Sequence, residues 1–283
     1  MIRLESIGKS FGRVRAVDGL SLHINAGEVF GLLGPNGAGK TTTISIATGL
    51  LAPDEGTALV HGHDPRLAGA RRAIGVAPQS LALYDELTGR ENLDFFAAIY
   101  NLHGRERAER VQEALTLVTL VDRQHDRVQG YSGGMKRRLN LAAAVLHRPA
   151  VVFMDEPTAG VDPHARHAIF EIVGTLKSRG CTVVYSTHYM EEAERLCDRV
   201  AIIDAGKVLA IDTVAGLLGR YGGQSVLEFS REREGGRVER VESADPIAAL
   251  TQAAAGGRLQ SARIHGPTLE SVFLTLTGRS PRD

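Results

Sequence analysis

The distribution of hydrophobic and polar positions divides the chain into alternating strands and helices. Up to about residue 30, short runs alternate apolar and polar side chains, which is typical of strands in a partly solvated sheet: IRLESI, LSLHI and EVFGLLG. A glycine-rich segment at 34–40 interrupts this pattern, and TTTISIATGLL then favours a helix that ends before Pro53. The chain therefore begins with strands, a glycine-rich turn and a helix.

A helical region and a second group of strands follow. From about residue 86 to residue 148 the apolar positions recur at helical spacing, as in Val111, Leu115 and Val118. Beyond it, AVVFMD (150–155) and CTVVYSTH (181–188) are short apolar runs typical of buried parallel strands, and the segment between them favours a helix. Strands that alternate with helices predict an α/β sheet, with a helical subdomain at about 86–148.

The pattern changes again near Tyr221. VLEF and RVERV alternate, glycine pairs separate the segments, and the closing TLESVFLTLTG places four apolar side chains on one helical face: Leu269, Val272, Phe273 and Leu276. We therefore expect a main domain at 1–220 and a small C-terminal α+β module at 221–283.

Composition narrows the class of protein. The 33 basic residues balance the 33 acidic ones, so net charge gives no indication of a nucleic-acid partner. Charged side chains interrupt the apolar runs, which argues against a membrane span, and Arg3, Glu5 and Lys9 argue against a signal peptide. Cys181 and Cys197 lack the spacing of a zinc site or a disulfide framework. We expect a cytoplasmic protein.

The glycine-rich segment fits the pattern GxxxxGK[ST] between a predicted strand and a predicted helix. Glycines let successive amides turn toward phosphate oxygens, Lys40 would reach the β- and γ-phosphates, and the Thr41 hydroxyl would hold Mg²⁺. The simpler alternative is a glycine-rich turn with a surface lysine. The residues expected around the nucleotide are Gly34, Pro35, Asn36, Gly37, Ala38, Gly39, Lys40, Thr41 and Thr42.

A pair of carboxylates follows the apolar run VVFM. Asp155 and Glu156 would lie at the carboxyl end of a strand, which is the edge where open α/β sheets bind ligands. Neighbouring side chains on a strand point to different sides, so Asp155 would support Mg²⁺ and Glu156 would act as general base for the attacking water. Taken alone, Asp-Glu-Pro also fits a solvated turn, and the phosphate loop favours the catalytic interpretation.

A second potential anion site occurs in YSGGMKRR (131–138). Ser132, Gly133 and Gly134 at a helix start would offer backbone amides to an anion, although an ordinary helix N-cap explains the same residues. Two anion sites in one chain require either two anions or two chains.

Together, GPNGAGKTT, YSGGMKRR, MDEPTAGVDP and the segment STH resemble the nucleotide-binding subunit of an ABC transporter, in the expected order over roughly residues 1–220. The resemblance implies a P-loop NTPase with a RecA-like core, an antiparallel β subdomain and a helical subdomain, which uses ATP and Mg²⁺. It also implies a homodimer or a paired ATPase subunit, in which Ser132 to Gly134 of one chain complete the ATP site of the other.

The same resemblance assigns four further positions. Phe11 would stack on adenine, Gln79 would contact Mg²⁺ and the catalytic centre, Asp162 would belong to the D-loop, and His188 would be the catalytic switch residue. Each has a simpler alternative, since Phe11 could be a core residue, Gln79 a loop amide and His188 a histidine with satisfied hydrogen bonds.

Two departures refine the resemblance. Met135 stands where Gln is usual and Tyr131 where Leu is usual; Met135 should be tolerated because backbone amides and Ser132 would contact the phosphate. The D-loop sequence AGVD and the closing TLESVFLTLTG resemble an exporter-type branch that includes drug-resistance and nodulation-export ATPases.

The expected function is ATP binding and hydrolysis that power a separate integral-membrane permease, with export as the direction, at the cytoplasmic face of the membrane and without a nucleic-acid partner. The resemblance also implies that the segment after Gln79 would meet the permease. One alternative is a soluble ABC-type ATPase that acts on ribosomes or nucleic acid; such proteins typically carry tandem cassettes or a long coiled coil. A P-loop kinase of small metabolites would not explain Ser132 to Gly134 or Glu156.

Overall fold

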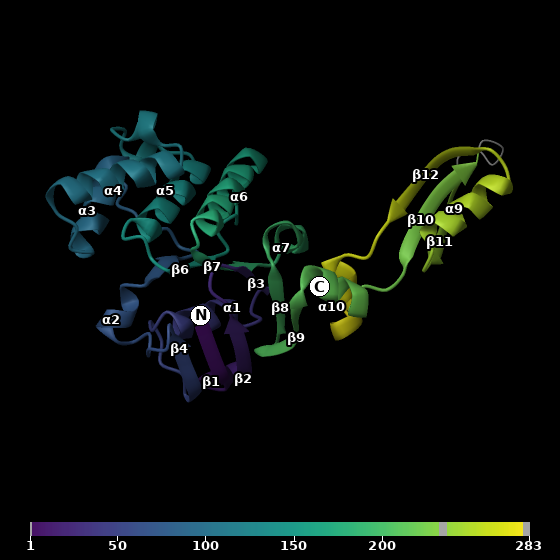
Figure 1. The fold of residues 1–283 in the computed structure, drawn as a ribbon, viewed down its shortest axis with the longest axis horizontal. Helices are drawn as coiled ribbons and strands as arrows, with labels where there is room; N and C mark the ends of the chain where they lie inside the picture. The colour runs from purple at the N-terminus through teal and green to yellow at the C-terminus, as the bar shows by residue number, and fades with distance from the viewer. Residues whose placement is uncertain (1, 232–236, 280–283) are drawn as a thin grey trace. The chain divides into compact units, whose positions relative to one another are not determined.

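The computed structural model describes residues 2–231 and 237–279, which form two units (Figure 1). The first unit is Met1–Thr213 and the second is Val214–Asp283. The boundary between the units precedes helix α8 (Val214–Tyr221), because this helix packs against α10 (Leu269–Thr277) of the second unit. The boundary expected after residue 220 therefore falls inside α8.

A six-stranded sheet in the order β5-β6-β7-β3-β8-β9 forms the centre of the first unit. All neighbouring strands are parallel except β8 and β9, which are antiparallel. Every residue of β3, β6 and β7 is buried. The uninterrupted apolar runs predicted this for β6 and β7. The expectation of a partly solvated strand at EVFGLLG is wrong, because β3 lies inside the sheet between β7 and β8. The strands are β3 (Val29–Leu33), β5 (Ile74–Ala77), β6 (Val151–Asp155), β7 (Thr182–Thr187), β8 (Arg199–Asp204) and β9 (Lys207–Thr213).

Helices pack against this sheet and join its strands. α1 contacts β6, α6 contacts β7, and α7 contacts β3 and β7. Phe30, Phe153 and Val184 are almost completely buried between them. The helices are α1 (Lys40–Ala47), the short α2 (Ala68–Arg71), α6 (Pro163–Ser178) and α7 (Met190–Leu196).

An antiparallel sheet in the order β2-β1-β4 completes the core of this unit. Ile2, Leu4 and Leu20 from its strands belong to the same buried cluster as Phe30 and Ile44. The mixed sheet and this antiparallel sheet confirm the predicted P-loop NTPase class. The strands are β1 (Ile2–Phe11), β2 (Val14–Ile24) and β4 (Glu55–Val60).

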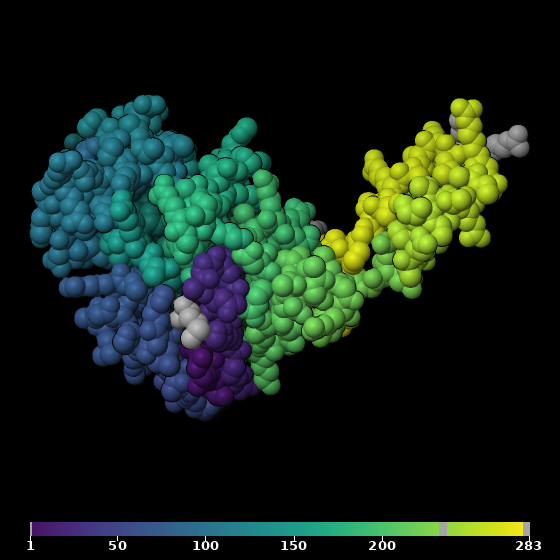
Figure 2. All heavy atoms as spheres, in the orientation of Figure 1, coloured from purple at the N-terminus to yellow at the C-terminus, as the bar shows by residue number. Residues whose placement is uncertain are grey.

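The helical region lies together as one group, seen as a continuous blue-to-teal surface in Figure 2. Val111, Leu115 and Val118 are fully buried within it. The Thr88 hydroxyl and the Glu91 carboxylate form a reciprocal capping box at the start of α3. The elements are α3 (Gly89–Ile99), α4 (Gly104–Leu117), α5 (Gly133–Val145) and two short 3₁₀ turns, η1 (Val121–Arg123) and η2 (Val128–Gly130).

The second unit contains a small sheet and two groups of helices. Its antiparallel sheet has the order β11-β10-β12, and α9 covers the side that carries Leu227 and Phe229. In α10, Leu269, Val272 and Phe273 are fully buried, on the predicted face. The elements are β10 (Ser225–Arg231), β11 (Val238–Ser243), α9 (Pro246–Ala255) and β12 (Leu259–His265), besides α8 and α10.

Candidate nucleotide-binding and hydrolysis site

A cleft of about 420 Å³ opens at the carboxyl ends of β3 and β6. In this cleft the fold brings the glycine-rich loop together with three predicted residues from other parts of the sequence, Phe11, Gln79 and Glu156. Phe11 is 52% exposed and is therefore not a core residue. The cleft is lined by Phe11, Ala16, Asn36, Gly37, Gly39, Lys40, Thr41, Thr42, Gln79 and Glu156.

Two glycines of the loop are required by close backbone contacts. A Cβ on Gly34 would lie 2.1 Å from the carbonyl oxygen of Ile203. Gly39 has a φ of 100° and precedes α1, and a Cβ there would lie 2.5 Å from the carbonyl oxygen of Ala16. The loop therefore leads directly into the first turn of α1, whose N–H groups lack intrahelical acceptors and favour an anion.

Lys40 is buried and folded back into its own loop. Its Nζ donates to the carbonyl oxygens of Gly34, at 2.8 Å, and Pro35, at 3.0 Å. The same nitrogen lies 3.2 Å from Glu156 Oε1, so the lysine and the carboxylate form a buried ion pair. The one basic side chain lining the cleft thus has an anionic partner within the protein.

Thr41 and Asp155 lie side by side, as their predicted shared task requires. Thr41 Oγ1 donates to Asp155 Oδ2 at 2.8 Å, and Ser186 Oγ donates to Asp155 Oδ1 at 2.5 Å. A hydroxyl and a carboxylate are the hard oxygen ligands that Mg²⁺ uses beside water and phosphate oxygens. The donor set therefore fits Mg²⁺.

Glu156 has a strained backbone conformation, and its carboxylate is contacted by three predicted residues, Lys40, Gln79 and His188. Its φ is 45°, in the left-handed region that non-glycine residues rarely adopt. Its backbone N–H is held by the carbonyl and hydroxyl oxygens of Ser186. Its Oε2 lies 3.4 Å from Gln79 Nε2 and 3.3 Å from His188 Nδ1.

The other predicted residues lie outside this cleft in the same chain. Ser132 is the N-cap of α5, and its Oγ accepts a hydrogen bond from the N–H of Met135 at 3.2 Å. Asp162 is the N-cap of α6; the N–H of Ala165 donates to its Oδ1 and holds the pKa of the carboxyl below its ordinary value. Ser132, Gly133, Gly134 and Asp162 are absent from the lining of the cleft described above.

Sequence reasoning gave no role to several residues that organise the site. The Ser186 hydroxyl donates to the Asp155 carboxylate and accepts the backbone N–H of Glu156, while Thr158 and Glu192 form a buried hydrogen bond behind them. Ser186 stands in the predominantly apolar run CTVVYSTH, and Thr158 stands in the turn after Glu156, so neither hydroxyl was conspicuous in the sequence. Polar side chains inside otherwise buried segments were the signal that could have identified them.

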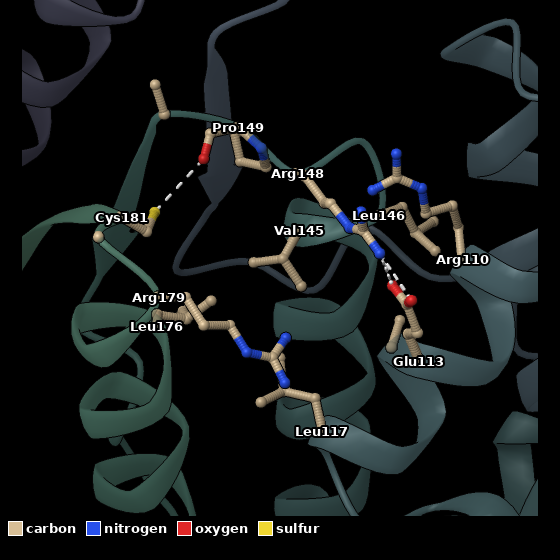
Figure 3. A pocket seen from close by; sticks show the side chains of 13 residues that line it. Arg110, Glu113, Leu117, Val145, Leu146, Arg148, Pro149, Leu176, Arg179 and Cys181 are labelled. Carbon is tan, nitrogen blue, oxygen red and sulfur yellow. Dashed lines mark hydrogen bonds and ion pairs between the residues drawn. The ribbon is translucent and has the colours of Figure 1, made fainter.

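A separate cavity of about 310 Å³ lies at the amino ends of β6 and β7, shown in Figure 3. Pro149 and Cys181 line it, and Arg148 beside them forms two hydrogen bonds to Glu113, at 2.6 and 2.7 Å. The predicted site residues do not line this cavity.

Across the described residues, no helix has the length and hydropathy to cross a membrane.

Comparisons with known proteins identify the family. A family model described as ABC transporter matches residues 17–159. The chain is 40% identical to the linearmycin resistance ATP-binding protein of Bacillus subtilis strain 168 over the full length of both. It is 41% identical to the Nod factor export ATP-binding protein I of Paraburkholderia xenovorans, covering 100% and 98% of the two chains. It is 40% identical to a daunorubicin resistance ATP-binding protein of Streptomyces coeruleorubidus, covering 98% and 95%.

Solved structures agree with these relatives. An ATP-binding subunit of an ABC transporter superposes with a TM-score of 0.71 at 30% identity, covering 78% of this chain and 93% of that one. A dimeric ATP-binding cassette in a post-hydrolysis state, bound to ADP and phosphate, gives 0.69 at 27% identity, covering 75% and 98%. The chain therefore belongs to the ABC transporter family and is an ATP-hydrolysing subunit of that family.

Proposed function

We propose that this ATPase powers export through a separate membrane permease, at the cytoplasmic face of the membrane. The observation that carries this proposal is the full-length similarity to ATP-binding proteins of resistance and Nod factor export, which includes the C-terminal unit as well as the ATPase unit. A soluble ATPase that acts on ribosomes or nucleic acid has no comparable support.

ATP would bind with adenine on the exposed ring of Phe11 and phosphates on the loop 34–42. Lys40 would exchange Glu156 for the β- and γ-phosphates, since its Nζ already lies in the cleft. Thr41 and Asp155 would hold Mg²⁺, and Gln79, which lines the same cleft as Thr41, would contribute from beside Glu156. When bound, the ion would neutralise charge on the phosphate oxygens.

Glu156 would act as the general base of hydrolysis. It would accept a proton from the water whose oxygen attacks the γ-phosphorus, and the bond to the ADP oxygen would break as phosphate forms. His188 and Gln79 lie on the same carboxylate oxygen of Glu156 and would orient it. Removal of Lys40 by the phosphates would leave Glu156 free to accept that proton.

Ser132, Gly133 and Gly134 would complete the ATP site of a partner subunit. These residues begin α5 outside their own chain's cleft, so their free amides are available to another anion. Asp162 lies close to Gly134, with its Oδ2 3.6 Å from the position of a Cβ there, and would share that interface. The dimeric state of a similar cassette supports this arrangement.

The permease would dock on an apolar surface that follows Gln79. Leu81, Tyr84, Phe95 and Ile99 are all exposed there, and the rings of Tyr84 and Phe95 meet edge to face at 4.9 Å. Exposed apolar side chains gathered on one subdomain are a mark of protein–protein contact.

Two variants test the proposed roles in hydrolysis and ATP binding. Glu156→Gln should retain ATP binding and lose turnover, because the amide keeps the shape of the side chain and removes the base. Lys40→Ala should weaken ATP binding itself, measured by calorimetry. Turnover near the wild-type rate in Glu156→Gln would remove Glu156 from its proposed role.

The choice between transport and a soluble role needs a second measurement. The flanking genes are searched for a multi-helix hydrophobic protein, and the chain should co-purify with it. Tyr84→Asp should abolish this association while leaving basal ATPase activity intact. Co-sedimentation with ribosomes in place of a membrane protein would contradict the transport proposal.

A further inference from the structure

Glu192 forms a buried hydrogen-bond centre behind the catalytic residues. It lies on α7 and is only 2% exposed. Its Oε2 accepts hydrogen bonds from three hydroxyls: Thr158 at 2.9 Å, Tyr185 at 3.0 Å and Thr187 at 2.8 Å. One oxygen atom therefore joins residues from three positions in the sequence.

The carboxylate has only limited charge compensation. Arg166 Nε is 3.5 Å from Glu192 Oε1, and no hydrogen bond to that oxygen is present among the described residues. Burial, together with Glu192, raises the pKa of Tyr185 well above its usual value, so this phenol stays protonated and donates. A buried carboxylate is costly unless its partners are well placed, and an apolar side chain would fill the same space at lower cost.

The three donors belong to the segments that carry the catalytic side chains. Thr158 follows Glu156 by two positions, and Thr187 directly precedes His188. The Thr187 hydroxyl also accepts the N–H of Tyr189 at 3.0 Å, which fixes the backbone on both sides of His188. Glu192 thus joins the end of β6 to the end of β7.

A second link leads from Glu192 to α6. Arg166, the ion-pair partner of Glu192, also lies over the ring of Tyr189 at 5.1 Å. The backbone N–H of Arg166 donates to the carbonyl oxygen of Asp162 at 2.9 Å, so the ion-pair partner of Glu192 lies in the first turn of α6, which Asp162 caps. The same carboxylate is therefore connected to the segment that follows Thr158 and ends at Asp162.

We propose that Glu192 is a positioning residue that sets the distance between Glu156 and His188 and fixes the start of the D-loop. This inference rests on the catalytic roles proposed above for Glu156 and His188. Those two side chains are 3.3 Å apart, and a displacement of about 1 Å in such a contact can lower a rate roughly a hundredfold. Within the part of the chain that the structure describes, the hydrogen-bond and ion-pair partners of Glu192 include no nucleotide-loop residue and no residue lining the cleft, so it acts on the catalytic step and not on ATP affinity.

The test compares Glu192→Ala with Glu191→Ala, a matched control that removes the same charge from an exposed position of the same helix. Assays are run well below the midpoint of thermal unfolding of each variant. Glu192→Ala should lower kcat at least tenfold, change the Kd for ATP by less than twofold and alter the pH profile of kcat. Glu191→Ala should leave all three unchanged.

Conservative variants separate positioning from a structural role. Glu192→Gln keeps an acceptor for the three hydroxyls but places an amide N–H₂ beside Arg166, so its kcat should lie between those of wild type and Glu192→Ala. Tyr185→Phe and Thr158→Val each remove one donor and should lower kcat several-fold without weakening ATP binding. If Glu192→Ala does not fold, these two variants test the positioning role of Glu192 in its place.

Two results would overturn the inference. The first is that Glu192→Ala lowers the melting temperature but has the same kcat and the same pH profile of kcat as Glu191→Ala. The second, where Glu192→Ala does not fold, is full activity in both Tyr185→Phe and Thr158→Val. An active Glu156→Gln would instead contradict the proposed function, so the two failures are distinguishable.

Discussion

At the scale of single residues, the buried pair of Lys40 and Glu156 sets up a competition for the lysine. In the structure Lys40 has three partners, two carbonyl oxygens and the Glu156 carboxylate. Both side chains are almost completely excluded from solvent, where an ion pair is weakly screened. With the phosphate-binding role proposed for Lys40, ATP has to displace Glu156 from the lysine before the phosphates can take its place.

This competition predicts that Glu156→Gln binds a non-hydrolysable ATP analogue roughly two- to tenfold more tightly than wild type, because the amide holds Lys40 less strongly than the carboxylate does. Calorimetry measures the affinity. Both proteins should carry Gly133→Asp, which blocks the proposed dimer so that dimer trapping does not raise the apparent affinity. Equal or weaker binding by Glu156→Gln would show that Glu156 does not hold Lys40 in solution.

The sequence allowed the candidate residues of this site to be predicted, but it did not allow their contacts to be predicted. Lys40, Thr41 and Asp155 were predictable because phosphate and Mg²⁺ chemistry demands those side chains at a strand end. The contact of Lys40 with Glu156 depends on how β3 and β6 are placed in the sheet, with β7 between them. Glu192 was not predictable, since its donors come from segments that only the tertiary fold brings together.

At the scale of elements, α5 holds the loop that carries Gln79. Arg137 donates to the carbonyl oxygens of Gln79, at 2.6 Å, and Pro78, at 3.3 Å. One turn later, Asn140 donates to the Pro78 carbonyl and accepts the N–H of Ala82. The helix that starts at Ser132 and the loop beside Glu156 are thus connected, and burial lowers the pKa of Arg137.

The connection predicts that Arg137→Met lowers the free energy of unfolding by about 1–3 kcal/mol, because two carbonyl groups lose a charged donor while the apolar stem is kept. Urea denaturation followed by circular dichroism measures the change. Lys136→Met is the control, since Lys136 pairs with the exposed Asp85 and its loss should cost less than about 1 kcal/mol. Similar costs for both variants would contradict the assigned role of Arg137.

Elements with strong patterns were predictable and weakly patterned ones were not. The buried strands β6 and β7 and helix α6 follow from continuous apolar runs and a terminal glycine. Strand β4 is mostly exposed or half-buried, and β9 has no fully buried residue, so neither has a distinct hydrophobic pattern. The strand order could not be predicted either, because it is determined by packing across the whole sheet.

At the scale of the whole molecule, the two helix starts that we propose as anion sites are kept apart within one chain. The cleft is backed by the N-terminus of α1, and Ser132 begins a different helix. Two-fold symmetry would bring the α5 N-terminus of each subunit to the cleft of the other and generate two equal sites. If one chain hydrolysed ATP as a monomer, the helix start at Ser132 would have no anion to bind.

The trans arrangement predicts that two inactive variants restore activity when mixed. Lys40→Ala damages the cleft, and Gly133→Asp damages the helix start; a side chain at Gly133 meets no atom within 4 Å, whereas one at Gly134 would collide with Ala165. Each mixed dimer then has one doubly damaged site and one intact site. ATPase activity should return to a fraction below half of the wild-type rate, measured as phosphate release.

A cross-link gives the prediction an independent readout. Burial raises the pKa of Cys181 to about 11 and that of Cys197 still further, so the native thiols stay protonated and react slowly at neutral pH. Ser132→Cys in one chain and Asn36→Cys in the other should therefore form a specific disulfide when ATP is bound to a hydrolysis-deficient Glu156→Gln background. Mixed dimers that form without regaining activity and without this cross-link would contradict the trans assignment, whereas a cross-link without activity would show that the two sites must hydrolyse together.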